Sequence, residues 1–217
     1  MPTNYPTSLD NFTNPTANDS LNLPSHSTQH ANANDAIEAI EAKLGVGNAD
    51  KVGMYSVVTT DVSGASTLTF DNVFTSAYKN YRVVLALTGT TTTGSVSMQL
   101  RAGGVTNSAN YSHASVGYIS NNSGTNGYSN GIASSWQLGY AVNSLGGLFS
   151  GDFVIYNPQV ATYSTLTGTN VSTISTTNNY TFVTGGMMNV TTQFDGFIIT
   201  TAGNMTGQVS VYGMRNT

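Results

Sequence analysis

Residues 30–47 of this 217-residue chain read HANANDAIEAIEAKLGVG and carry its clearest helical pattern. Ala33, Ile37, Ile40 and Leu44 recur at intervals of four, three and four, so they follow one narrow face of an α-helix. A helix this short is marginal in water by itself, and isoleucine at both kinds of seam position favours three or more strands over two. The pattern therefore predicts a short oligomerising helix over residues 30–47, with three or more copies associating through it.

After the helix, the apolar period changes to the alternation of β-strands. From residue 54 onward, short alternating segments are separated by Gly, Asn, Ser and Pro, and no further helix intervenes. This arrangement predicts an antiparallel β-sandwich or jelly-roll head over residues 53–217. The expected strands are 54–60, 66–70, 81–88, 95–101, 111–119, 134–142, 148–156, 163–167, 180–188, 196–200 and 208–214, with tight turns at 178–179 and 202–204 and surface loops at 103–110 and 120–131.

Before the helix, residues 1–29 contain four of the five prolines among Asn, Thr and Ser, which predicts an extended segment without a core of its own. A disordered tail is one interpretation of such a composition. Apolar side chains nevertheless recur through the segment, and they favour a peptide that binds a groove on a neighbouring subunit or partner. These candidate anchor residues are Tyr5, Leu9, Phe12, Leu21 and Leu23.

The composition excludes several classes of protein. Only 7% of the residues are charged, compared with roughly 25% in an ordinary globular protein. The net charge is −4 and the six cationic side chains are scattered, which argues against nucleic-acid binding. The absence of cysteine excludes disulfides and thiol chemistry. The N-terminal residues do not have the pattern of a signal peptide, and no apolar run approaches the roughly 20 residues of a membrane span. We therefore expect synthesis in a cytoplasm and no insertion into a membrane.

Residues 6–47 carry three linked motifs. L-D-x-F-x-N-P-T-x-x-D-S-L spans 9–21, P-S-H-S-x-Q-H spans 24–30, and N-D-A-x-E-A-I-x-A-K-L-G spans 34–45. Together they resemble the N-terminal module of structural proteins from tailed bacteriophages. The later segments GDFVIYNP (151–158) and VSVYG (209–213) resemble the β heads of phage fibres. The resemblance implies a virion protein that attaches through its N-terminal part to other proteins of the particle and assembles as a homotrimer.

The residue types needed for catalysis are sparse in the β-rich part. Asp152 and Asp195 are its only carboxylates after Asp71, and their positions suggest a strand start and a turn more than the paired acids of a glycosidase. His113 lies within an expected strand, and no nucleophile elbow is present. We therefore expect no catalytic residues, no enzyme activity and no cofactor.

Two histidines precede the helical seam. His26 and His30 are four residues apart, and a three-fold axis would bring six imidazoles together, which suits a metal ion. The alternative is that they cap and hydrogen-bond at the start of the helix. The second interpretation is favoured, so the sequence predicts no metal site, although the metal hypothesis stays open.

Receptor binding by such a head is expected to use exposed aromatic rings beside amides and hydroxyls. Tyr128 and Trp136 are the candidate contacts, although Trp136 also suits a core position. The predicted function is a fibre-like appendage, a tail or head fibre, whose head binds a host-surface glycan or another virion protein through residues 103–110 and 120–131. The alternative is a capsid decoration or neck protein that stabilises the particle through contacts between its head and the shell.

Overall fold

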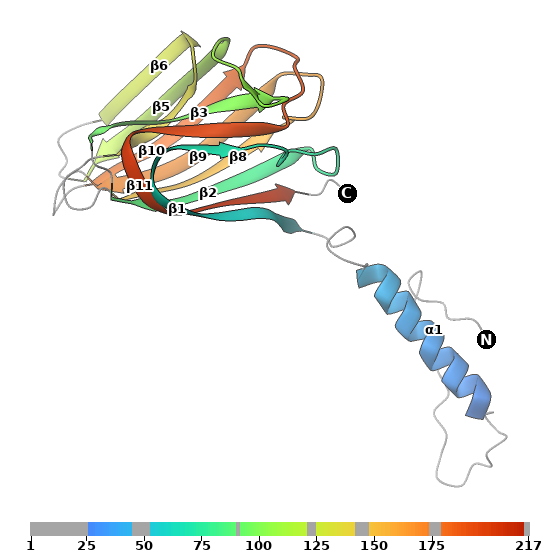
Figure 1. Cartoon of the computed structure of the whole chain (residues 1–217). Helices are drawn as coiled ribbons and strands as arrows, with labels where there is room; N and C mark the ends of the chain where they lie inside the picture. Colours follow the sequence, from blue (N-terminus) through green and yellow to red (C-terminus); the bar gives the residue numbers. More distant parts are fainter. Residues whose placement is uncertain are drawn as a thin grey trace. The chain divides into compact units, whose positions relative to one another are not determined.

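A computed structural model describes residues 26–44, 53–89, 92–120, 125–141, 148–173 and 179–214 of the chain (Figure 1). Side chains are described throughout these ranges except at 41–44, 125, 126, 128 and 141. The chain divides into two compact units, Met1–Gly53 and Met54–Thr217. The anchor residues expected from the sequence, Tyr5, Leu9, Phe12, Leu21 and Leu23, lie outside the described residues.

The first unit contains the helix α1, His26–Leu44. It begins four residues before the predicted start, so residues 26–29 are helical and not extended as expected. Five of its 19 residues are alanine, which has the highest helix propensity. No helix among the described residues is both long enough and apolar enough to cross a membrane.

The second unit is built from antiparallel strands. Their bounds are β1 Met54–Phe70, β2 Asn80–Thr88, β3 Gly94–Ala102, β4 Val105–Thr106, β5 Tyr111–Ile119, β6 Thr125–Ala133, β7 Trp136–Ala141, β8 Phe149–Tyr156, β9 Ser164–Thr173, β10 Asn179–Met188 and β11 Gly196–Met214. They form one sheet in the order β4-β3-β11-β2-β8-β9-β10-β5-β6, with β1 beside β11 and β7 beside β3.

The sheet curls over itself because β11 joins its two halves (Figure 1). Residues 196–201 of β11 pair with β3, whereas residues 206–214 pair with β2. Strand β1 pairs with β11 on both sides of this change, and its register shifts near Val62 and Ala65 show β-bulges there. Bulges bend a strand without ending its pairing. The two halves therefore face each other like the layers of a sandwich, and β7, which pairs only with β3, packs against β9 and β10.

The core lies between these layers. Buried and more exposed residues alternate along the central strands. In β2, for example, Tyr81, Val83, Leu85 and Leu87 are buried and the residues between them are not, so one face of the sheet is apolar and points inward. Polar contacts also link the layers: the Asn170 side-chain amide in β9 donates to the carbonyl of Leu138 in β7 at 2.5 Å. The largest fully buried side chains include Trp136, Tyr81, Tyr111, Phe74, Phe149, Phe153, Phe182, Phe194 and Phe197.

The prediction of a mainly β, antiparallel sandwich-like head with one preceding helix is confirmed. Two of the turns and loops predicted for the head are wrong. Residues 202–204 do not form a tight turn, because β11 continues through them opposite the bulged part of β1. Most of the expected loop 120–131 is strand β6, which pairs with β5 at the end of the sheet order. An edge strand needs only main-chain hydrogen bonds on one side, so its sequence carries little apolar alternation.

Candidate interaction surfaces

The apolar seam of α1 is exposed within its own unit. Ile37 is 54% exposed and Ile40 is 46% exposed, and Ala33 is exposed as well. Leu44 ends the helix, but its side chain lies outside the described residues. Half-exposed aliphatic side chains on one face of a helix are available for contact with other protein. Of the seam predicted from the sequence, Ala33, Ile37 and Ile40 are exposed on this helix.

The two histidines at the start of α1 lie together. The Nε2 atoms of His26 and His30 are 3.0 Å apart, and the two rings meet edge to face with centroids 4.4 Å apart. Both side chains are exposed. Among the described residues, no group of three or more His, Asp or Glu side chains could hold a metal ion, so this pair has no third ligand within that part of the chain.

The predicted receptor loop 103–110 is a short hairpin held by polar contacts. Gly103 and Gly104 turn the chain with φ of 57° and 78°, values that glycine adopts without strain. The Arg101 guanidinium contacts an Asp71 carboxylate oxygen at 2.7 Å and the Thr106 hydroxyl at 2.6 Å. Asp195 accepts the backbone N–H of Gly103 at 2.8 Å. The hairpin is therefore fixed in shape, and it presents Val105, which is 71% exposed.

Trp136 is not a surface residue. It is fully buried, and its ring meets Tyr111 edge to face at a centroid distance of 5.3 Å. The Tyr111 hydroxyl accepts the backbone N–H of Leu100 and donates to the Asn107 carbonyl. Burial raises the pKa of the Tyr111 phenol above its ordinary value. The candidate role of Trp136 as a receptor contact is thus replaced by a role in the core, where it joins β7 to β5.

Tyr128, the other candidate contact, lies in β6 opposite Ser115. Its side chain is outside the described residues, so its role as a contact stays a prediction. The same strand carries Ile132, which is strongly exposed near the end of the sheet order.

The outward face of β2, β8, β9, β10 and β5, here called the outer face, carries little charge. Most of its described residues are small, hydroxylated or β-branched, and one ion pair lies on β2 and β8. There the Arg82 guanidinium binds Asp152 through two contacts of 2.7 and 2.5 Å. The hydrogen bond with Asp152 raises the pKa of Arg82. The residues of this face include Val84, Ala86, Ser150, Thr169, Val171, Thr181, Val183, Gly185, Ser112, Ala114, Val116 and Tyr118.

Four of these residues form an exposed apolar cluster that the sequence analysis did not identify. Val116 in β5 is the direct cross-strand partner of Val183 in β10. Tyr118 and Val171 both pair with Thr181, on opposite sides of β10. Tyr118 is 66% exposed and Val183 is 57% exposed. We call this group, Val116, Tyr118, Val171 and Val183, the outer cluster. The sequence does contain a signal for this cluster. Segments 111–119 and 180–188 carry apolar residues at both odd and even positions, so apolar side chains lie on both faces of these strands.

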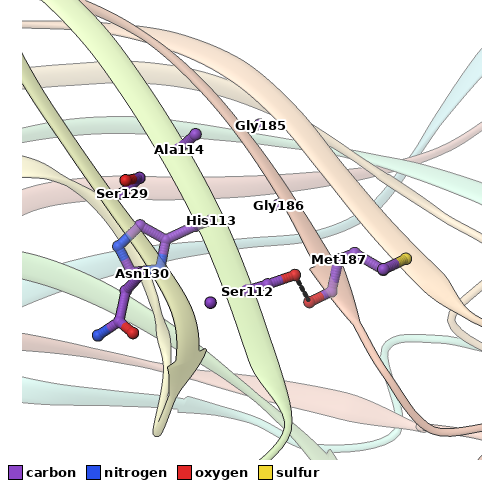
Figure 2. A pocket seen from close by; sticks show the side chains of 9 residues that line it. Ser112, His113, Ala114, Ser129, Asn130, Gly185, Gly186 and Met187 are labelled. Atoms are coloured by element: carbon purple, nitrogen blue, oxygen red, sulfur yellow. Dashed lines mark hydrogen bonds between the residues drawn. The ribbon is translucent and has the colours of Figure 1, made fainter.

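Two hollows mark the surface of the head. The first, of about 470 Å³, lies over β5, β6 and β10, with His113 and Asn130 from neighbouring strands on one side and Gly185, Gly186 and Met187 on the other (Figure 2). Gly185 lacks a side chain, and an added Cβ there would meet open space. The second, of about 560 Å³, is lined mainly by residues of β2, β8 and β9, together with Thr181 of β10, and includes Asp152.

Neither hollow brings together a catalytic set of groups among the described residues. Burial lowers the pKa of His113, and a hydrogen bond with the backbone of Ser135 acts in the opposite direction. Asp152 is paired with Arg82, and Asp195 binds the Gly103 backbone. These carboxylates therefore have structural partners, and the expectation of no catalytic residues stays a prediction.

No family model, curated protein or solved structure matches this chain.

Proposed function

We propose that this chain is a structural protein of a tailed-bacteriophage particle, a homotrimeric fibre-like appendage. Its N-terminal segment attaches to the particle, α1 joins three chains, and the β head binds the host surface. The motifs in residues 6–47 support the attachment role through their resemblance to phage structural proteins. The proposal depends most on one observation, which is the uncovered isoleucine seam of α1.

The seam supplies a driving force of useful size. Full burial of an isoleucine side chain contributes about 1.5–3 kcal/mol, and about half of the side chain is still exposed at Ile37 and at Ile40. Covering the rest gives roughly 1 kcal/mol for each side chain, or on the order of 6 kcal/mol for the six isoleucines of a trimer. Ala33 leaves room for close approach of the helices, and the absence of charge on the seam removes electrostatic opposition.

The head has properties suited to contact with a neutral, hydroxyl-rich ligand such as a surface glycan. Its outer face offers hydroxyl groups and small side chains, and its β3–β4 hairpin is fixed by Arg101 and Asp195 before any ligand arrives. Preorganised loops lose little conformational entropy on binding. Three heads on one stem gain avidity of about 10²–10⁴ over one head through effective concentration, without any new contact.

The outer cluster favours a second candidate, a decoration or neck protein whose head packs on the shell. Val116, Tyr118, Val171 and Val183 form a flat apolar area with no charged side chain among them. Such a surface fits another protein better than it fits a sugar, because protein interfaces have apolar centres.

A cell-binding experiment with a matched control tests the fibre proposal. Ile37→Asp with Ile40→Asp puts charge on the seam, whereas Thr28→Asp with Ala31→Asp adds the same charge roughly 140–200° around the helix. The proposal predicts that wild-type and control proteins bind host bacteria equally and that the seam variant, now single chains, binds at least about 100-fold more weakly.

Equal binding by all three proteins would refute the role of the trimer in avidity. No binding by any of them, together with hundreds of copies in each particle, would favour the decoration protein.

A further inference from the structure

The histidine pair of α1 places two ring nitrogens close enough together for one ion to reach both. The Nε2 atoms of His26 and His30 are 3.0 Å apart, on successive turns of the helix. At that separation one ring donates its Nε2–H to the other ring, which then carries its own proton on Nδ1. If the donor ring also carries its proton on Nδ1, both Nε2 lone pairs become available to a single acceptor.

The same pair lies on the oligomerisation seam. Because the helix starts at His26, the seam intervals run four, three, four, three and four through His26, His30, Ala33, Ile37, Ile40 and Leu44. The two histidines therefore occupy the first two seam positions, which face the other helices when the isoleucines do. A polar ring covered in this way costs free energy unless it has a partner.

We propose that His26 and His30 chelate a divalent transition-metal ion, with one ion held by three chains at the N-terminal end of the seam. This inference rests on the proposed trimer. Imidazole is a good ligand for nickel, copper and zinc, and the described residues of one chain offer no third ligand beside the pair. The remaining ligands come from the same two histidines of the other two chains.

The spacing of the pair fits this coordination. Two metal–nitrogen bonds of about 2.1 Å to atoms 3.0 Å apart enclose an angle of about 91°. That is close to the right angle between neighbouring ligands of an octahedral ion, and three pairs around a three-fold axis supply six nitrogens. A tetrahedral angle would need the two nitrogens about 3.4 Å apart. The ion takes the place of the shared proton, which moves to Nδ1 of the donor ring, so a neutral pair releases no proton.

Titration of the full-length chain with nickel chloride tests the proposal. The shifted-pair variant, His30→Ala with Ala31→His, keeps two histidines in α1 but places them about 140° apart around the helix. The expected result is one nickel ion for three wild-type chains by calorimetry and elemental analysis, with an affinity about 100-fold weaker in the shifted pair because the chelate is lost. Magnesium chloride is the negative control, since magnesium prefers oxygen ligands.

Sedimentation of the same samples separates this inference from the proposed function. A wild-type trimer that binds nickel no better than the shifted pair would overturn the metal site and leave the trimer intact. If the wild-type chain sediments as a monomer, the proposed assembly fails. In that case, one nickel ion per chain with a lower affinity in the shifted-pair variant would support chelation by the pair. Equal nickel affinities of the wild-type chain and the shifted-pair variant would overturn it.

Discussion

Replacing Trp136 tests whether the head uses this residue as a core anchor or as a ligand contact. The ring is fully buried, meets Tyr111 edge to face, and packs against Gly186, where an added Cβ would lie 2.6 Å from the indole. Truncation of such a residue to alanine leaves a cavity and costs about 3–5 kcal/mol of unfolding free energy. We therefore expect Trp136→Ala to destabilise the head strongly.

Thermal unfolding measures this effect. For a domain of this size, 1 kcal/mol corresponds to about 2–4 °C in Tm, so Trp136→Ala should lower the Tm on the order of 10 °C. Trp136→Phe keeps an aromatic contact with Tyr111 and should lose much less. Tyr118→Ala removes an exposed ring and should change the unfolding free energy by no more than about 0.5 kcal/mol. An unchanged Tm in Trp136→Ala, together with lost binding to host cells, would refute the core assignment.

Four further predictions concern the helix and the surfaces of the head. Ile37→Asp with Ile40→Asp should yield single chains by sedimentation with the Tm of the head unchanged; a trimer would assign association to the head. Deleting residues 1–24 should abolish incorporation into particles while the oligomer persists, which quantification of the protein in purified particles checks. Val183→Lys should leave stability within about 0.5 kcal/mol, because the side chain is exposed, but should block packing on a shell protein if the outer cluster makes that contact. Because burial lowers the pKa of His113, the unfolded state binds a proton on this residue before the folded state does, as the pH falls below about 6.5. The unfolding free energy should therefore decrease as the pH falls below that value. His113→Gln should reduce this dependence of the unfolding free energy on pH, as measured by urea titrations at several pH values.

The helix and most of the strands follow directly from local patterns. Alternation in 81–88 and 95–101 matches β2 and β3 closely, because each has one face in the core. The start of α1 was missed because residues 26–29 contain no apolar residue to extend the seam. Strand β6 was missed for a related reason, since an edge strand of Gly, Asn and Ser is held by its main chain.

Long-range pairing accounts for the remaining differences. Strands β1 and β11 pair with each other on both sides of their bulges, so each is one continuous strand. The sequence predicted two separate strands in each of these segments. The outer cluster depends on β5 pairing with β10, although four strands separate them in the sequence, and no local pattern reveals that pairing. Trp136 suited both a core and a surface role, and only the contact with Tyr111 and the overlying β10 distinguishes them.

The central claim is that three copies of this chain associate through α1. Sedimentation equilibrium of the full-length protein at low micromolar concentration measures this directly. A chain of 22.7 kDa predicts a trimer mass of 3 × 22.7 = 68.1 kDa. A single species of 22.7 kDa under the same conditions would contradict the account.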